Sequence, residues 1–363
     1  MEYRTLPHGG EQISVIGLGI SHIGGSRKEI AEIVSAAIDN GINYFDMIAP
    51  HKDVFYGYAD AFEGRREKVM TQFHFGALYE NSEYGWGRDL AQIKKIFEWQ
   101  MQLFQTDYTD MGFIHCIDEL DDFNNVMNNG LWDYMKGLKA EGRIRHLGFS
   151  SHNPEVAKRI IDTGLVDMMM FSINPAYDYR QGYFAIGDVE DRYALYRLCE
   201  SMGIGISVMK TFCAGQLLDA GISPFKRALT KTQCIQYALD RPAVMTVLPG
   251  VRSLADLHEV LEYVNATEEE KDYSVISECV PEDTHGACMY CNHCQPCPGG
   301  LNVGMINKYY DLAKVGDQLA VTHYANLDVH ASDCLQCGHC ESRCPFHVKQ
   351  ESRMREIAAY FGK

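Results

Sequence analysis

Short runs of hydrophobic residues alternate with amphipathic stretches through the first 265 residues of the chain. The runs are rich in β-branched and aromatic side chains, which predicts strands. Stretches between them, such as 27–41, 88–104 and 191–203, carry apolar side chains at helical spacing. We expect strands at residues 13–20, 43–47, 68–75, 110–118, 144–151, 167–173, 205–210 and 245–250.

Eight strand–helix units in roughly 250 residues predict an α/β fold of the (β/α)8 type, a TIM barrel. A doubly wound sheet is the alternative, but the count of eight and the absence of a G-x-G-x-x-G segment count against it. The chemistry of such a barrel lies at the carboxyl ends of its strands. The residues that fall there are Asp46, His74, His115, His152, Lys210 and Gly250.

Eight cysteines form two tight runs near the end of the chain, CMYCNHCQPCP and CLQCGHCESRCP. In a C-x2-C-x2-C segment three thiolates converge on one cubane, and a fourth Cys followed by Pro reaches the neighbouring cluster. We therefore expect two [4Fe–4S] clusters in a ferredoxin-like domain. Cluster 1 would use Cys288, Cys291, Cys294 and Cys344, and cluster 2 would use Cys334, Cys337, Cys340 and Cys297.

Two zinc knuckles are the alternative, because C-x2-C pairs also bind zinc. Overlapping triplets that each end in Cys-Pro count against that alternative. The other cysteines are scattered, as thiols in a reducing cytosol would be. They are Cys116, Cys199, Cys213, Cys234 and Cys279. Since Met1 leads directly into polar sequence, we expect no signal peptide and a cytoplasmic location.

Composition predicts a globular chain with a large core and a small additional module. Hydrophobic residues make up 46% of the 363 positions, and no apolar run is long enough to span a membrane. The net charge of −16 argues against binding to nucleic acid. We expect a barrel at 1–265, a charged linker at 266–285 and the cluster domain at 286–363.

The barrel segments resemble a known family in order and spacing. They are YRTLPHGGEQISVIGLG, GINYFD, GRREKV, DYTDMGFIHCID, EGRIRHLGFSSH, GIGISVMK and TVLPGV. Together with the cysteine runs, they resemble the aldo/keto reductases, and specifically the bacterial branch with a C-terminal ferredoxin domain. The resemblance covers essentially the whole chain.

The resemblance implies an active site built from Asp, Tyr, Lys and His around a nicotinamide ring. Asp46 matches the Asp and His115 matches the His. The Tyr position, five residues after the Asp, is His51, and the Lys position is His74. A shifted register would instead put Tyr56 in the Tyr role.

Asp46, His51, His74 and His115 should then converge at the barrel mouth. Three imidazoles and a carboxylate suit zinc, iron(II) or manganese, so we expect a divalent metal. The alternative is a metal-free site in which His51 protonates the carbonyl. Further candidates are His22 as a ligand, and Tyr177 and Tyr179 as lining of the substrate pocket.

The resemblance also implies a nucleotide site, with departures. Ser151 and His152 replace the family's frequent Ser-Asn pair. Where NADP users place a cation against the 2′-phosphate, this chain has Asp256, with Arg252 nearby. NAD is therefore at least as well supported as NADP. The expected cofactor-binding residues are Ser151, His152, Lys210, Gly250, Arg252 and Glu259.

The leading hypothesis is an iron–sulfur oxidoreductase that acts on a small carbonyl or hydroxy compound and exchanges electrons with a partner protein. The alternative is a metal-dependent lyase, dehydratase or hydrolase that has abandoned the nicotinamide and keeps structural or redox-sensing clusters. A third hypothesis is a non-catalytic electron-transfer or scaffold subunit. Substrate, reaction direction and oligomeric state are left open by the sequence.

Overall fold

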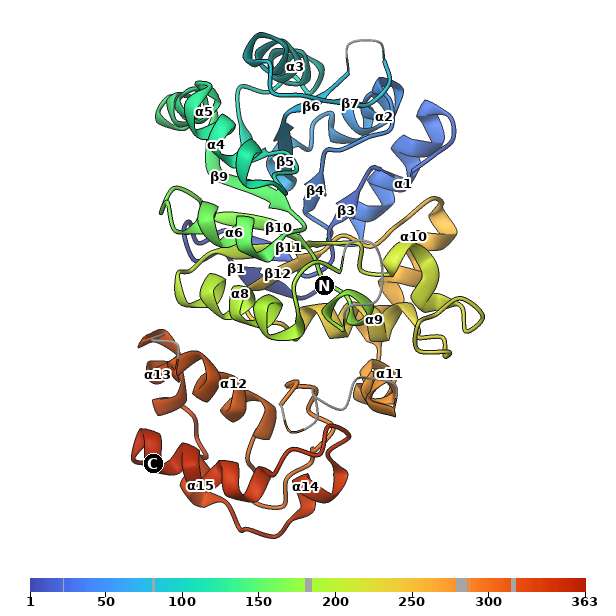
Figure 1. Ribbon diagram of the computed structural model, residues 1–363. Helices are drawn as coiled ribbons and strands as arrows, with labels where there is room; N and C mark the ends of the chain where they lie inside the picture. The colour runs from blue at the N-terminus through green and yellow to red at the C-terminus, as the bar shows by residue number, and fades with distance from the viewer. Residues whose placement is uncertain (22, 80–81, 180–184, 279–285, 287, 315–317) are drawn as a thin grey trace.

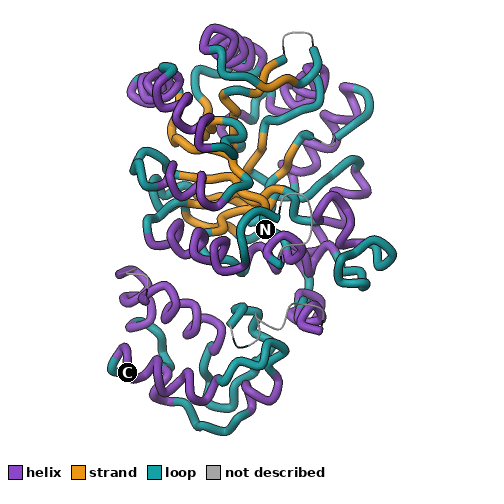
Figure 2. Tube along the Cα trace, viewed as in Figure 1, coloured by secondary structure: helices purple, strands orange, loops and turns teal. Residues whose placement is uncertain are grey.

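A computed structural model describes residues 1–363 except 22, 80–81, 180–184, 279–285, 287 and 315–317. It contains a barrel of parallel strands surrounded by helices, and a smaller helical part formed by the last residues of the chain (Figure 1). Figure 2 shows that the strands all lie within the larger part.

Eight parallel strands form the barrel, in the order β12-β11-β10-β9-β8-β5-β4-β3. The circle closes where Gly17 donates a backbone hydrogen bond to Val247, at 2.8 Å, and Val247 donates one to Val15, at 3.0 Å. The eight predicted strands and the TIM-barrel fold are thereby confirmed. The strands are β3 (Leu18–Gly19), β4 (Tyr44–Asp46), β5 (Met70–Phe75), β8 (Thr109–Ile114), β9 (Ile144–Ser151), β10 (Met168–Ser172), β11 (Gly205–Met209) and β12 (Val244–Val247).

The strands are buried on both faces, which explains their nearly continuous hydrophobic sequence. Inside the barrel, methionine and aromatic side chains form one packed cluster that includes Met111, Phe113 and Met168. Leu6 and Ile13 belong to the same cluster. They come from the N-terminal hairpin of β1 (Tyr3–Thr5) and β2 (Gln12–Ser14), which therefore plugs the barrel floor.

Several outer helices start at side-chain caps. Ser26 forms a capping box with Glu29 at the start of α1, and Asp89 caps α3. The barrel helices are α1 (Arg27–Asp39), α2 (Lys52–Phe62), α3 (Leu90–Leu103), α4 (Leu120–Asn128), α5 (Leu131–Ala140), α6 (Pro154–Ile161), α7 (Pro175–Asp178), α8 (Val189–Ser201), α9 (Lys231–Leu239) and α10 (Leu254–Leu261).

A short hairpin extends from the barrel mouth after β5. It consists of β6 (Ala77–Leu78) and β7 (Gly85–Trp86), which pair antiparallel. Its tip pairs with the start of α2, because His51 and Glu83 form a backbone bridge. In addition, the backbone N–H of Tyr84 donates to the carbonyl of Pro50 at 2.8 Å. This pairing fixes the segment around Tyr84 over the mouth.

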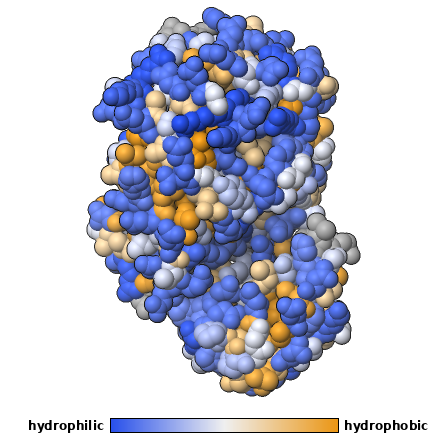
Figure 3. Space-filling model, turned by 180° about the vertical axis from the view of Figure 1, so that it is seen from behind, coloured by the Kyte–Doolittle hydropathy of each residue, from blue (hydrophilic) through white to orange (hydrophobic). Residues whose placement is uncertain are grey.

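The C-terminal part contains α12 (Val303–Lys314), α13 (Gln318–Ala325), α14 (His339–Arg343) and α15 (Gln350–Phe361). No strand follows β12 in the residues that the structure describes, so this part is helical, and its assignment as ferredoxin-like stays a prediction. The helices α12 and α13 lie beside α8 (Figure 1). Viewed from behind, the small part lies below the barrel, and hydrophilic side chains cover most of the visible surface (Figure 3).

In its described residues the predicted linker packs against the outer helix α9. It contains α11 (Glu268–Lys271), and its residues Tyr273 and Ile276 are buried in the main hydrophobic cluster. Among the helices that the structure describes, none has the length and hydropathy that a membrane crossing needs.

Candidate functional site

Four side chains at the barrel mouth form a chain of hydrogen bonds. Asp46 ends β4, and its Oδ1 lies 2.6 Å from Nε2 of His74, which extends from β5. Nδ1 of His74 lies 3.1 Å from Nδ1 of His115, the residue after β8. Nε2 of His115 lies 2.7 Å from the hydroxyl of Tyr84. The parallel strands thus bring Asp46, His74 and His115 together, as predicted from their places at strand ends.

One set of protons satisfies every link of this chain. A carboxylate can only accept, so Nε2 of His74 carries a hydrogen for Asp46 and its Nδ1 is left as an acceptor. His115 then donates from Nδ1 to His74, and its Nε2 accepts from the hydroxyl of Tyr84. Both imidazoles are neutral in this arrangement. The donors all run from Tyr84 toward Asp46.

Electrostatics favours a neutral His115. Burial lowers the pKa of His115 well below its usual value, and His74, Arg88 and His152 lower it further. Partial burial raises the pKa of Tyr84, so its phenol keeps its proton at neutral pH. Tyr84 is nevertheless 42% exposed, which makes it the member of the chain that a substrate entering from solvent can reach.

A polar layer supports the chain from below. Gln72 donates from Nε2 to Oδ1 of Asp46 at 2.7 Å, while its Oε1 accepts from Tyr44 and from Ser207, at 2.5 and 3.0 Å. Strand register explains the contact, since Gln72 lies directly beside Asp46 in the β4–β5 ladder. These buried partners hold the Asp46 carboxylate in one orientation.

His51 does not join this chain. It lies at the N-cap of α2, and in the described residues no hydrogen bond or ion pair links its side chain to Asp46, His74 or His115. The predicted set is therefore a line of three groups extended by Tyr84. Tyr56, the alternative from a shifted register, lies under the guanidinium of Arg27, 5.6 Å from its ring centre.

The two facing Nδ1 atoms also bear on the predicted metal. Their separation of 3.1 Å is close to that of two nitrogens on one tetrahedral ion. Asp46 on the outer nitrogen of His74 is the partner that metal-bound histidines commonly have. The residues therefore fit a metal ion between His74 and His115, in place of the shared proton. The metal stays a prediction, and His22 lies outside the described residues.

A second polar group lies at the ends of β9 and β11. Asp118 accepts from the backbone N–H of His152 at 2.6 Å and faces its Nδ1 at 2.9 Å. Nε2 of His152 lies 2.9 Å from Nζ of Lys210, so the imidazole bridges a carboxylate and an ammonium. The hydroxyl of Ser151 donates to Asp118 at 3.1 Å. Ser151, His152 and Lys210 are thus placed together by Asp118, a residue that the sequence analysis did not single out.

Charge in this group is strongly polarised. Although burial opposes it, the bonds from His152 lower the pKa of Asp118 to about 2. Burial lowers the pKa of Lys210 to about 8. Cys116 completes the group, because its Sγ, a carboxylate oxygen of Asp118 and a nitrogen of His152 all lie within 4.8 Å of one another. Burial and Asp118 raise the pKa of Cys116 to about 12, so its thiol is neutral.

The remaining predicted nucleotide residues lie after β12, around the start of α10. Gly250 is exposed and open, and the backbone N–H of Arg252 donates to Asp256 at 3.0 Å. Glu259 and Asp256 both bind Lys231, at 2.7 and 3.2 Å.

Lys231 supplies the cation that the sequence analysis missed, because it begins α9 and is distant in sequence. Because two carboxylates share it, Lys231 offsets only part of the negative charge that was expected to repel a 2′-phosphate.

A model of the aldo/keto reductase family matches residues 15–233, more than half of the chain. The chain belongs to the aldo/keto reductase family. An uncharacterized oxidoreductase of Bacillus subtilis (strain 168), YqkF, is 27% identical over 296 residues, which cover 74% of this chain and 94% of that protein. L-galactose dehydrogenase of Arabidopsis thaliana is 22% identical, covering 74% of this chain and 89% of the relative.

Solved structures agree with this fold. The holo form of aldo-keto reductase AKR11C1 from Bacillus halodurans superposes with a TM-score of 0.64 at 21% identity, covering 77% of this chain and 97% of that one. An aldo/keto reductase from Klebsiella pneumoniae, solved with NADP and acetate, gives 0.55 at 18% identity, covering 77% and 96%. Members of this family are oxidoreductases that act on small molecules, so the chain is an aldo/keto reductase-like oxidoreductase. Both cysteine runs lie beyond the family match.

The division of the eight cysteines of this aldo/keto reductase into two sets stays a prediction. Cys291 interacts electrostatically with Cys288 and Cys344, and Cys340 with Cys334 and Cys297, while Cys294 interacts with Cys291, Cys344 and also Cys340. All eight are free of disulfides. Backbone N–H groups lie against the sulfurs, for example Gln336 at 3.5 Å from Cys334 and Val348 at 3.4 Å from Cys344. Such donors stabilise cluster-bound thiolates, so these residues fit the group.

Zinc fits the same cysteines less well. Four sulfurs around one zinc ion lie about 3.8 Å apart, given Zn–S bonds of about 2.3 Å. In the described chain, which includes all eight of these cysteines, three or more ligand atoms gather within 4.8 Å only at Cys116, Asp118 and His152. Three of these sulfurs therefore nowhere lie as close together as a tetrahedral zinc site needs, and the metal that they bind stays a prediction.

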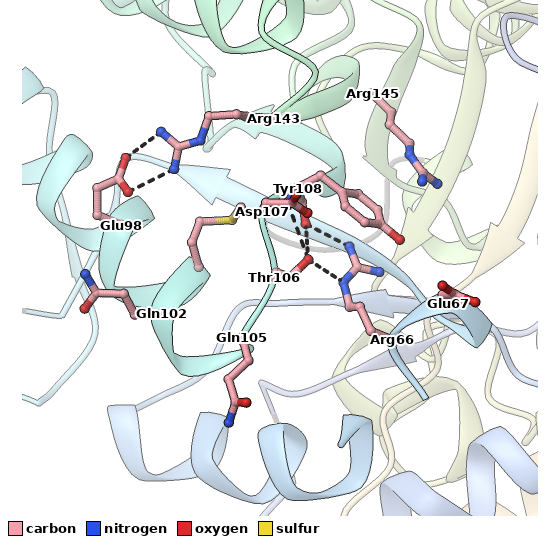
Figure 4. Close-up of a pocket in the computed structure, with 11 residues that line it drawn as sticks. Arg66, Glu67, Glu98, Gln102, Gln105, Thr106, Asp107, Tyr108, Arg143 and Arg145 are labelled. Atoms are coloured by element: carbon pink, nitrogen blue, oxygen red, sulfur yellow. Dashed lines mark hydrogen bonds and ion pairs between the residues drawn. The ribbon is translucent and has the colours of Figure 1, made fainter. Parts of the chain in front are cut away.

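A wide pocket of about 950 Å³ lies at the opposite end of the barrel, where β5, β8 and β9 begin (Figure 4). Its arginines are held by carboxylates: Arg143 pairs with Glu98 at 2.7 Å, and Arg66 and Arg145 pair with Asp110 at 3.0 and 2.9 Å. Because chemistry in this fold occurs at the carboxyl ends of the strands, this pocket has no part in the site.

Proposed function

We propose that this aldo/keto reductase is an iron–sulfur oxidoreductase that interconverts a small carbonyl compound and its alcohol with NADP or NAD. The observation that carries the proposal is the chain from Tyr84 through His115 and His74 to Asp46. It places a reachable phenol at the mouth and connects it to a buried carboxylate. Tyr84 takes the role of the family's Tyr from a different position in the chain, and His74 occupies the position of the family's Lys.

The chain of donors gives each residue a role. Tyr84 exchanges the proton of the substrate oxygen, and His115 and His74 pass it between Tyr84 and Asp46. The donor direction assigned above suits removal of a proton from an alcohol; reduction of a carbonyl would use the same bonds reversed. The nicotinamide supplies or accepts the hydride when it is bound.

Binding of the dinucleotide is assigned to two groups. Lys210, with His152 beside it, offers a cation at the mouth for the pyrophosphate. Arg252 and Lys231 offer cations near the start of α10, where the N-terminal end of the helix also favours a phosphate. Because Lys231 partly offsets Asp256, we propose NADP as the preferred nucleotide, where the sequence alone supported NAD at least as well.

The direct test uses anaerobically purified protein, NADPH, NADH and a panel of small aldehydes and ketones. We expect binding of NADPH by fluorescence and slow turnover that falls by about 10²–10⁴ in Tyr84→Phe. Tyr56→Phe is the matched control, since it removes a phenol away from the mouth. Wild-type activity in Tyr84→Phe would remove Tyr84 from the mechanism.

A second candidate is a metal-dependent lyase, dehydratase or hydrolase, favoured by the 3.1 Å between Nδ1 of His74 and Nδ1 of His115. Elemental analysis separates the two. A stoichiometric divalent metal that His74→Ala releases, together with no binding of either nucleotide, supports the lyase class. Nucleotide binding without such a metal supports the reductase.

We also propose two [4Fe–4S] clusters in the C-terminal part, which would exchange electrons with a partner protein. Cys337 is exposed and would face that partner. About eight irons per chain with matching acid-labile sulfide are expected. About two zinc ions without sulfide would overturn this part of the proposal.

A further inference from the structure

A fully buried arginine of the barrel reaches the first cysteine turn. Arg241 follows α9 and is 0% exposed. Its guanidinium donates to the carbonyl of Met289, between Cys288 and Cys291, at 2.7 Å. It also donates to the hydroxyl of Tyr273 at 2.9 Å and to the hydroxyl of Tyr193. The barrel therefore places a positive charge directly behind the Cys288–Cys291 segment.

Asp240 partly compensates this charge, since its carboxylate raises the pKa of Arg241. Among the described residues no carboxylate lies within ion-pair distance of the guanidinium, and its Nε has no hydrogen-bond partner. Asp240 is adjacent in sequence, but its carboxylate accepts from Tyr273 and Gln236, and burial raises its pKa. A buried cation with an unused N–H donor is costly, which indicates that an anionic group belongs beside it.

Tyr179 adds an unpartnered donor on the same side. Its side chain is 2% exposed, and its hydroxyl has no hydrogen-bond partner among the described residues. The phenol interacts electrostatically with Arg241 and with the Cys291 thiol. A buried hydroxyl without an acceptor is destabilising, unless a bound group supplies the acceptor.

Tyr179 also belongs to the barrel mouth. It caps α7, the short helix after β10. Asn174 begins that helix and donates to the carbonyl of Lys210 at 2.9 Å. One short segment therefore connects the predicted nucleotide-binding lysine to the wall of the first cysteine set.

The second cysteine set has different surroundings. Cys337 is exposed, and Leu335 beside it is 62% exposed. Cys340, Cys334 and Cys297 pack in the hydrophobic cluster of the C-terminal helices. Only Cys337 of this set is exposed, whereas Cys288 and Cys291 pack against the main cluster of the barrel.

We infer that Arg241 and Tyr179 form the barrel's half of the cavity for the cluster of Cys288, Cys291, Cys294 and Cys344, and that they make it the more easily reduced of the two clusters. Positive charge and hydrogen bonds stabilise the reduced state, which is the more negative one, and so raise the potential. Electrons that enter on the Cys337 side then come to rest beside the mouth. The inference rests on the iron–sulfur part of the proposed function.

Anaerobic redox titration of the loaded full-length protein, followed by electron paramagnetic resonance, tests the inference. We expect two separate potentials in the wild type. Tyr179→Phe should lower one of these potentials by about 59 mV. For one electron this is a tenfold change in the reduction equilibrium, about the effect of removing one hydrogen bond to a charged group. Tyr196→Phe is the control, because its buried hydroxyl donates to Asp178.

Arg241→Gln should lower the same potential further and leave the other unchanged. If that variant does not fold, Tyr179→Phe decides. Unchanged potentials in Tyr179→Phe with full iron content, or equal shifts of both clusters, would overturn the inference. Absence of iron and sulfide from the wild-type protein would instead overturn the proposed clusters themselves. Failure to reduce any carbonyl would overturn the proposed reductase activity, while the two cluster potentials could still be measured.

Discussion

Replacing Asp46 by Asn tests the proton chain with little change in shape. Asp46 is 4% exposed and accepts hydrogen bonds from His74 and Gln72 at 2.6 and 2.7 Å. Asn can accept the same two bonds through Oδ1, but it has no charge and cannot take up a proton. Catalysis should therefore suffer more than folding.

The magnitudes follow from the geometry. Each bond loses its charge assistance, about 1–1.5 kcal/mol, so the two together lose about 2–3 kcal/mol. The substitution also removes the cost of burying a carboxylate, several kcal/mol, which offsets this loss. We expect the free energy of unfolding to change by less than about 2 kcal/mol. We expect kcat to fall by about 10²–10⁴, with KM nearly unchanged because Asp46 lies behind His74.

Steady-state kinetics with NADPH and chemical denaturation measure both quantities. Asp110→Asn is the matched control, because Asp110 is also buried but pairs with Arg66 and Arg145 at the barrel floor. It should lose about 2–4 kcal/mol of stability and keep its kcat. A kcat within threefold of wild type in Asp46→Asn would refute the proton chain.

Two further predictions concern the cofactors. Because burial lowers the pKa of Lys210 to about 8, its charge is present at pH 7 and is lost as pH rises. The affinity for NADPH should fall between pH 7 and 9, and Lys210→Met should bind weakly at both; an equally steep fall in that variant would contradict the assignment. Cys344→Ser should lose about four irons, those of the cluster beside Arg241, and keep the cluster of Cys334, Cys337 and Cys340. Loss of the other cluster's spectrum would contradict the pairing.

The sequence predicted most of the fold, because each barrel strand is a short apolar run that is buried on both sides. It also predicted that Asp46, His74 and His115 converge, since parallel strands bring their carboxyl ends to one mouth. It placed His51 with them by family position alone. The structure leaves that side chain at a helix N-cap, apart from the others.

The contacts that the sequence missed depend on long-range geometry. Tyr84 reaches His115 because a hairpin outside the regular strand–helix pattern pairs with the start of α2. Lys231 meets Asp256 because α9 and α10 lie side by side. Spacing and periodicity along the sequence do not reveal such contacts. Counting charges only in the loop that carries Arg252 and Asp256 therefore missed Lys231.

The buried guanidinium of Arg241 has a consequence for how the protein matures. Before the iron–sulfur group is inserted, a nascent chain would bury the Arg241 cation with too little negative charge beside it. The Tyr179 hydroxyl would lack an acceptor at the interface between the barrel and the C-terminal helices. That interface should open readily and be cut by proteases. Insertion of the cluster would then protect the protein from proteolysis. Cells short of iron would degrade the cluster-free protein and accumulate no barrel without its clusters.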